Sequence, residues 1–292
     1  MSHELTRIHA AVDRVIADGK RGLLVTVVDT HGSTYRRAGA RAVIAEEYTC
    51  GAISGGCVER DLALRKFEGF EPRLITYDSS GSDDIVFGLG LGCRGVIEML
   101  VQPFDREHPP SLPPIPDREP VIWTTTFQGR DLLTEVLEPQ RAIAIFGGGG
   151  DVEPVVTLAR AVGWRVDVFR GHQMPDTSAY DAVVVMTHNF LRDVDVLQAV
   201  LAWAVPYVGL LGPKARGEEI LAELPVTSEM RQRLHNPIGL DLGGDSPEDI
   251  ALAIIAEIQT VLNRRRADSL REKEGPIHQQ SSATAERSEP RR

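Results

Sequence analysis

Short apolar segments alternate with helical patterns from residue 142 onward, and this alternation limits the possible folds more than any other feature of the sequence. Parallel strands need a crossover connection, usually a helix, to bring the chain back to the same end of the sheet. The alternation is therefore typical of a doubly wound parallel sheet. Apolar runs predict its strands at residues 142–146, 165–169, 182–186 and 207–211. A last helix is predicted from Pro247, because Ser246 can cap it and proline suits the first helical position.

The first half of the chain predicts a mixed α/β domain. Apolar residues at helical spacing over 5–16 precede a buried-strand pattern over 23–28, and a second helical pattern covers 58–67. Further strand patterns, two of which form a hairpin, lie at residues 42–45, 49–53, 73–77 and 96–101. We therefore predict an α/β protein in which a mixed α/β N-terminal domain is followed by a Rossmann-like, doubly wound parallel-sheet domain.

Prolines mark the predicted boundary between these domains. Seven prolines lie between Pro103 and Pro120, and proline fits neither a helix interior nor a central strand. This segment predicts an extended linker. From residue 267 the chain is polar and rich in Ser, Gln, Glu and Arg, which is typical of disorder. The predicted organisation is a first domain over 1–103, a linker over 104–120, a Rossmann-like domain over 121–266 and a disordered tail over 267–292.

Charge and cysteine content narrow the function classes. The formal net charge of −10 argues against a surface for nucleic acid or anionic membranes. No apolar run approaches the roughly 18 residues of a membrane span, and we expect no signal peptide because an amphipathic pattern begins at once. Three cysteines in 292 residues, without zinc-type spacing, fit a reducing cytoplasm and predict no metal site.

Two of the three cysteines lie beside glycines. Cys57 follows Gly55 and Gly56, and Cys93 lies in the glycine-rich run 88–95. Glycine permits turns and close approach of the backbone to a ligand, so we predict thiols that react with or contact a ligand. The amides at the start of the following helix would favour a thiolate at Cys57. The alternative is that both cysteines are buried and inert.

A polar loop after the first predicted strand combines hydroxyl and guanidinium groups. Both groups bind phosphate oxygens well, and arginine can do so with two hydrogen bonds. The loop therefore predicts an anion site, and a solvated cluster of charges is the alternative. The residues are Ser33, Thr34, Arg36, Arg37 and Arg41.

Four glycines follow the strand pattern over 142–146, in the context of a dinucleotide-binding turn. Gly147 and Gly149 fit the first two glycines of the G-x-G-x-x-G pattern. Val152 takes the third glycine position, and Arg170 stands where an acidic residue would bind a ribose. An arginine side chain binds a phosphate group better than it binds the hydroxyls of a ribose. The turn therefore predicts a Rossmann fold, and these departures count against ordinary NAD(P) binding.

His188 follows the strand pattern over 182–186, at the sheet edge where open α/β sheets bind ligands. Its imidazole can donate to a phosphate or transfer a proton. The alternative is a loop histidine that only bonds to the backbone.

In this order, the motifs resemble the XdhC/CoxI family, the accessory factors of xanthine dehydrogenase and related molybdenum hydroxylases. The resemblance covers nearly the whole folded chain. It implies a factor that binds molybdenum cofactor as cargo, either as molybdopterin or in its dinucleotide form, supports its sulfuration and delivers it to an apo molybdenum hydroxylase. The motifs lie at residues 32–41, 54–59, 87–95, 147–151, 186–188, 207–212 and 237–258.

The same resemblance implies a cofactor chaperone rather than a turnover enzyme, with a cysteine desulfurase as a further partner and a homo-oligomer in the cytoplasm. Cys57 and Cys93 would lie near the cofactor. The residues predicted to bind it are Ser33, Thr34, Arg36, Arg37, Arg41, Gly55, Gly56, Gly147, Gly149, Asp151, Arg170 and His188.

Two alternatives from other function classes stay open. The first is an NAD(P)-dependent oxidoreductase that uses the Rossmann domain, and the arginine at position 170 counts against it. The second is a cysteine-dependent sulfurtransferase or other biosynthetic enzyme. A cysteine nucleophile needs a neighbouring base, and no histidine is close in sequence to Cys57 or Cys93.

Overall fold

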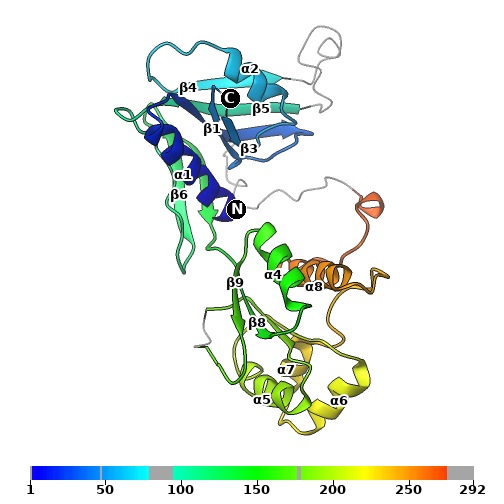
Figure 1. Ribbon diagram of the computed structural model, residues 1–292. Coiled ribbons are helices and arrows are strands. Elements are labelled where there is room, and N and C mark those ends of the chain that lie inside the picture. The colour runs from blue at the N-terminus through cyan, green and yellow to red at the C-terminus, as the bar shows by residue number, and fades with distance from the viewer. Residues whose placement is uncertain (1, 47, 79–94, 176–178, 275–292) are drawn as a thin grey trace. The chain divides into compact units, whose positions relative to one another are not determined.

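The computed structural model describes residues 2–46, 48–78, 95–175 and 179–274. The chain divides into two compact units, residues 1–139 and residues 140–292 (Figure 1). Each unit has its own five-stranded sheet and its own hydrophobic clusters. The run that contains Cys93 lies outside the described residues.

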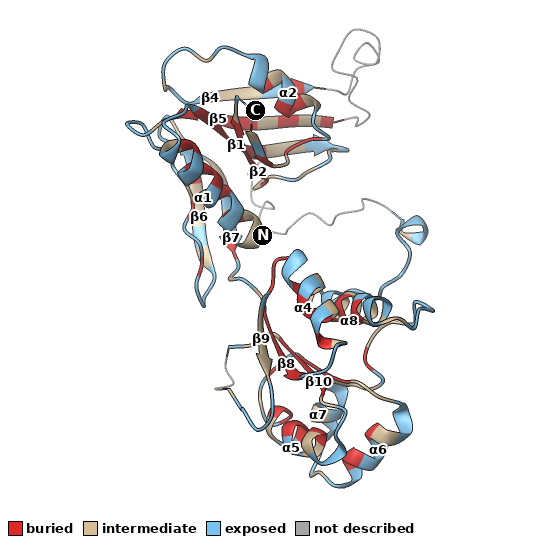
Figure 2. Cartoon of the chain, in the orientation of Figure 1, coloured by how far each residue is buried: buried red, intermediate tan, exposed pale blue. Residues whose placement is uncertain are grey.

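An antiparallel sheet with the strand order β3-β2-β1-β5-β4 forms the centre of the first unit. The strands are β1 (Gly22–Gly32), β2 (Arg41–Ala45), β3 (Tyr48–Gly51), β4 (Arg73–Asp78) and β5 (Gly95–Phe104). Successive side chains of a strand point to opposite faces of the sheet. Leu24 accordingly packs with helix α1 (Ser2–Ala17), and Val25 packs with helix α2 (Cys57–Leu64). Figure 2 shows the buried side of both helices and the buried strands between them.

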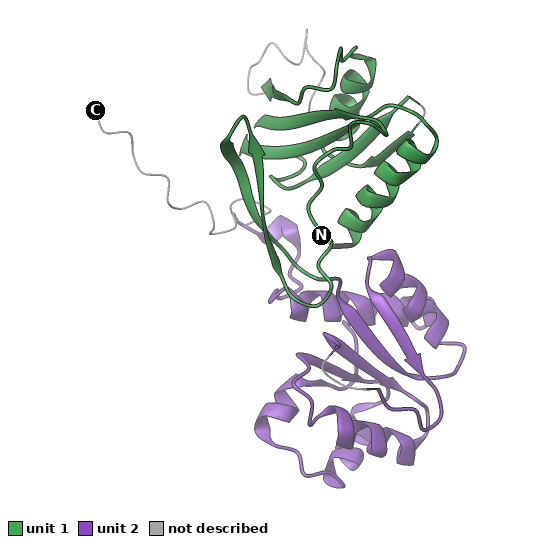
Figure 3. Cartoon of the chain, turned by 90° about the vertical axis from the view of Figure 1, so that its left-hand side faces the viewer, with its two compact units in different colours: residues 1–139 green, residues 140–292 purple. Residues whose placement is uncertain are grey.

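The boundary between the units differs from the predicted one. The first unit extends to Pro139 (Figure 3) and includes a hairpin of β6 (Val121–Phe127) and β7 (Arg130–Leu137). Glu135 of β7 forms an ion pair with Arg41 of β2, and both side chains are less than one tenth exposed. The prediction that the second domain starts at residue 121 is therefore corrected to a start at residue 140.

The proline-rich segment 104–120 also packs on the first unit instead of forming a free linker. Phe104 is fully buried, and Leu112 packs on the cluster beneath α1. The His9 Nε2 atom lies 2.8 Å from the carbonyl oxygen of Pro113. Phe104 is the last residue of β5, and prolines keep the rest of the segment out of the sheet, but an extended segment can still bury its apolar side chains.

The second unit contains the predicted parallel sheet. Its strands are β8 (Ala142–Gly147), β9 (Arg165–Phe169), β10 (Ala182–Met186), β11 (Tyr207–Leu210) and β12 (Leu234–His235), in the order β12-β11-β10-β8-β9. Every pairing is parallel, which confirms the Rossmann-like α/β fold. Because β9 and β10 lie on opposite sides of β8, the strand order reverses there. Open α/β sheets bind ligands at the carboxyl ends of the strands at such a point.

Helices cover both faces of this sheet. Helices α4 (Val152–Ala161) and α8 (Pro247–Leu262) pack on one face, and α5 (Phe190–Val200) and α6 (Lys214–Ala222) pack on the other. Helix α8 begins as predicted, because the Ser246 hydroxyl accepts a hydrogen bond of 3.1 Å from the amide of Asp249. Sequence reasoning did not predict α6, α7 (Ser228–Arg233) or β12, which are short and carry weak periodicity.

Within the predicted tail, Leu270–Glu272 form a short 3₁₀ helix, and residues 275–292 lie outside the described part of the chain. None of the helices in the described ranges is long and apolar enough to cross a membrane.

Candidate functional site

Cys57 is the first residue of α2, on a turn that the Ser54 hydroxyl organises. Gly56 has a φ of 104°, a left-handed conformation that glycine adopts without steric cost. The Ser54 hydroxyl accepts hydrogen bonds from the amides of Gly56 (3.0 Å) and Val58 (3.2 Å), and it lies 3.9 Å from Cys57 Sγ. The thiol is half-buried on this turn, whereas Cys50 is buried in the sheet.

The Glu59 carboxylate holds the same turn from its buried side. It accepts hydrogen bonds from the amides of Ile53 (2.8 Å) and Ser54 (2.9 Å), and from the Ser54 hydroxyl. Burial raises the pKa of Glu59, but the hydrogen bonds outweigh burial, so that the pKa falls below its ordinary value. Glu59 is therefore ionised at neutral pH, and its carboxylate accepts the hydrogen bond that the Ser54 hydroxyl donates. Neither residue was predicted as a site residue, because only the fold shows that both are buried.

Two arginines of the predicted anion loop have carboxylate partners. Arg36 Nη2 lies 2.7 and 2.8 Å from the two carboxylate oxygens of Glu4. Arg41 pairs with Glu135 inside the unit and donates a hydrogen bond of 2.8 Å to the carbonyl oxygen of Gly39. An unpaired charge inside a protein is strongly destabilising, and the ion pair and hydrogen bond of Arg41 avoid that cost. The structure thus gives Arg41 a structural role in place of the predicted anion contact.

The other predicted residues of the first unit lie on its surface or outside the described residues. Ser33 and Arg37 are exposed, as are Gly55 and Gly56, and the Thr34 hydroxyl donates to the carbonyl oxygen of Arg36 (2.8 Å). Cys93 lies outside the described residues, so the prediction that it lies near the cofactor together with Cys57 stays a prediction.

The second unit has an open cleft of about 730 Å³ where the strand order reverses. Residues at the carboxyl ends of β8, β9 and β10 line it, as does the first part of α5. The structure therefore brings together Gly147, Gly149, Arg170 and His188, which sequence reasoning had placed at three separate strand ends. His172, Arg192 and Asp195 also line the cleft, and none of these three was predicted as a site residue.

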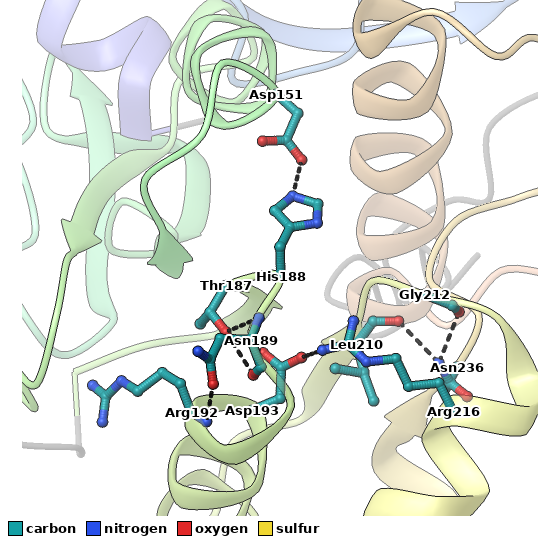
Figure 4. Close-up of polar contacts among 10 residues, drawn as sticks. All are labelled: Asp151, Thr187, His188, Asn189, Arg192, Asp193, Leu210, Gly212, Arg216 and Asn236. Carbon is teal, nitrogen blue, oxygen red and sulfur yellow. Dashed lines mark hydrogen bonds and ion pairs between the residues drawn. The ribbon is translucent and has the colours of Figure 1, made fainter.

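Asp151 and His188 connect two of these strand ends (Figure 4). The His188 Nε2 atom lies 2.7 Å from Asp151 Oδ2. Asp151 is the N-cap residue of α4, directly after the glycine turn of β8. His188 follows β10 with a φ of 57°, a conformation that residues other than glycine adopt seldom.

A buried aspartate fixes the loop that carries His188. Asp193 is fully buried in α5 and accepts hydrogen bonds from the Thr187 hydroxyl (2.6 Å) and from Arg216 Nη2 (2.6 Å). Asn189 caps the same helix, because its side chain accepts a hydrogen bond of 3.0 Å from the amide of Arg192. The sequence did not reveal Asp193, since a polar residue in an amphipathic helix carries no sign of its partners.

Comparisons with known proteins match both units. Residues 143–258 match the model of the XdhC Rossmann domain, and residues 15–78 match the model of the XdhC and CoxI family. A protein of Bacillus subtilis (strain 168) that is named as a probable subunit of xanthine dehydrogenase is 26% identical, with 86% of this chain and 96% of that protein covered. The molybdenum cofactor insertion chaperone PaoD of Escherichia coli (strain K12) is 26% identical, with 90% of each chain covered.

A solved structure resembles the chain as well. A crystal structure from Bacillus halodurans, described as a xanthine dehydrogenase, matches with a TM-score of 0.69 and 24% identity, over 88% of this chain and 96% of that chain. At this identity the likeness shows a common fold.

Proposed function

Because the chain belongs to the XdhC and CoxI family, we propose that it is an accessory factor that binds molybdenum cofactor and delivers it to an apo molybdenum hydroxylase of the xanthine dehydrogenase type. The names of two relatives support this role, since one is named for xanthine dehydrogenase and the other is a molybdenum cofactor insertion chaperone. Both align with more than four fifths of this chain.

The observation that carries the proposal is the half-buried thiol of Cys57 on a turn held by Ser54 and Glu59. Thiolates are soft ligands, which suits them to a metal that is bound through sulfur. In our proposal Cys57 contacts the molybdenum centre or holds the sulfur atom that is exchanged during sulfuration. Cys93 is proposed for the same surroundings, and a cysteine desulfurase is the proposed source of the sulfur.

The anionic parts of the cofactor must be bound by hydrogen-bond donors of the protein. In the first unit we propose Ser33, Thr34, Arg36 and Arg37, together with the exposed amides of Gly55 and Gly56, as such donors. In the second unit we propose Gly147, Gly149, Arg170 and His188, which line the cleft. Asp151 is proposed to act through its contact with His188. Backbone amides and arginines are the groups that bind phosphate best.

A cysteine-dependent sulfurtransferase is less well supported. A cysteine nucleophile is activated by an adjacent base. Within the described part of the chain, the hydrogen-bond contact of Cys57 Sγ is with the Ser54 hydroxyl, which donates its own hydrogen to the Glu59 carboxylate. Among the described residues no base is in direct contact with the thiol, so we favour cofactor binding over turnover chemistry.

The test is to purify the chain from a host that makes molybdenum cofactor and to measure molybdenum and pterin per folded molecule. We expect both in the wild-type protein. Cys57→Ala should lower both, and also lower activation of an apo xanthine dehydrogenase, with little change in melting temperature. Cys50→Ala is the matched control, because this buried thiol should affect the melting temperature and not the pterin content. A wild-type protein without molybdenum and pterin, or unchanged pterin in Cys57→Ala, would contradict the proposal.

A further inference from the structure

The cleft of the second unit departs from a dinucleotide site at the second glycine of its turn. In dinucleotide-binding Rossmann domains this glycine lets the backbone approach the pyrophosphate, which lies at the N-terminus of the next helix. Here a Cβ atom added to Gly149 would lie 2.6 Å from Asp151 Oδ1. The space beside Gly149 is therefore filled by a carboxylate oxygen, and the second oxygen of the same carboxylate contacts His188.

The carboxylate in this position disfavours a diphosphate. Asp151 is the N-cap residue of α4, and its side chain is 22% exposed. Its negative charge already interacts with the partial positive charge of the helix N-terminus. A pyrophosphate that entered this place would meet a like charge at contact distance, which is unfavourable.

Two arginines and a histidine line the cleft, together with one acidic residue, Asp195. Arg170 and His172 follow β9, and Arg192 belongs to α5. Arg170 Cδ lies 3.8 Å from the position of a Cβ atom on Gly148, beside the glycine turn. Gln173 lies between the arginines, since its side-chain oxygen accepts from the Arg170 amide (3.4 Å) and its carbonyl oxygen accepts from Arg192 Nη2 (3.2 Å). In a chain with a net charge of −10, these two arginines suit an anion with its charge at one end.

We propose that the cleft binds a phosphate monoester near Arg170 and Arg192, and that Asp151 excludes ligands with a diphosphate bridge. Two sources share this chemistry. One is a nucleotide with a phosphate on its ribose. The other is molybdopterin, which ends in a phosphate monoester, whereas its dinucleotide form has a diphosphate bridge. Only the second source rests on the function proposed above.

The experiment is a calorimetric titration of the full chain with adenosine 2′,5′-bisphosphate, which carries monoesters, and with ADP-ribose, which carries a diphosphate bridge. We expect the bisphosphate to bind about tenfold more tightly or better, the factor that corresponds to one charged hydrogen bond. Arg170→Ala should remove that advantage. Arg165→Ala is the matched control, because Arg165 is an exposed arginine at the start of β9, the strand that Arg170 follows, and does not line the cleft.

Asp151→Asn tests the exclusion of the diphosphate directly, because it removes the charge and keeps the shape of the side chain. We expect its affinity for ADP-ribose to rise about fivefold or more, so that the preference of the chain for the bisphosphate falls by at least that factor. Circular dichroism should show that each variant folds. The proposal is overturned if the wild-type chain binds neither ligand, if it binds both equally, or if Arg170→Ala binds the bisphosphate as the wild type does.

A second titration separates the two sources. If the cofactor phosphate occupies the cleft, a chain that carries co-purified cofactor should not bind the bisphosphate. If the cleft is a separate nucleotide site, the loaded chain should bind it as the empty chain does. Failure of the proposed function would appear as absence of molybdenum and pterin, and the titrations of the empty chain would still decide the preference for a monoester.

Discussion

Replacing Glu59 tests how far the Cys57 turn depends on a buried carboxylate. Glu59→Gln keeps an oxygen for the amides of Ile53 and Ser54, but loses the charged acceptor of the Ser54 hydroxyl. A hydrogen bond to a charged group contributes about 1.5–3 kcal/mol, so the free energy of unfolding of the first unit should fall by about 2 kcal/mol. Glu59→Ala leaves three donors unpaired and should lower it by about 3–5 kcal/mol.

The dependence of this effect on pH has a definite sign. The pKa of Glu59 is lower in the folded chain than its ordinary value of 4.5. A carboxyl with a lowered pKa contributes stability that is fully present above the unfolded pKa and is lost as the pH falls through the folded pKa. The difference in unfolding free energy between the wild type and Glu59→Gln should therefore be full at pH 7 and should shrink below about pH 4.5.

Urea unfolding at pH 7 and at acidic pH measures the free energies. The rate at which iodoacetamide alkylates Cys57, read by mass spectrometry, reports the turn locally. We expect this rate to rise in Glu59→Ala, because the turn opens more often when its donors are unpaired. Cys50, which is buried in the same unit, is the internal control. If both variants keep the wild-type unfolding free energy to within about 0.5 kcal/mol and the wild-type alkylation rate, the reasoning is refuted.

Two further predictions concern other pairs of contacting side chains, and both are checked by urea unfolding. Arg41→Ala should lower the unfolding free energy of the first unit by about 3–5 kcal/mol, because it leaves Glu135 buried and unpaired. Arg36→Ala, whose ion pair is about one third exposed, should cost less than about 1 kcal/mol, and equal losses would contradict this. Tyr207→Phe removes a hydrogen bond of 2.5 Å to Glu257 and should cost about 1–3 kcal/mol. Because hydrogen bonds lower the pKa of Glu257 below its ordinary value despite burial, this loss should shrink as the pH falls through that pKa, and a loss independent of pH would refute the assignment.

Local patterns predicted most strands of both sheets, because each strand carries its apolar run within a few residues. The parallel sheet of the second unit also followed, since strand patterns alternate with helical patterns along that part of the chain. The unit to which the β6–β7 hairpin belongs could not be predicted in this way. Its attachment depends on contacts such as Arg41 with Glu135, which are 94 residues apart, and the prediction of a boundary before residue 121 was therefore wrong.

For the candidate site, local patterns were enough to place Gly149, Arg170 and His188 after strands of one parallel sheet, and parallel strands bring their carboxyl ends to one edge. They were also enough to place Cys57 on a glycine turn at a helix start. The groups that meet at these places depend on the packing of each unit: Asp151 fills the space beside Gly149, and Glu59 accepts a hydrogen bond from the Ser54 hydroxyl next to Cys57. Periodicity and turn preferences act over a few residues along the chain. Which side chains contact each other depends instead on how the whole unit packs, because residues far apart in the sequence come within a few ångströms of each other only in the folded unit.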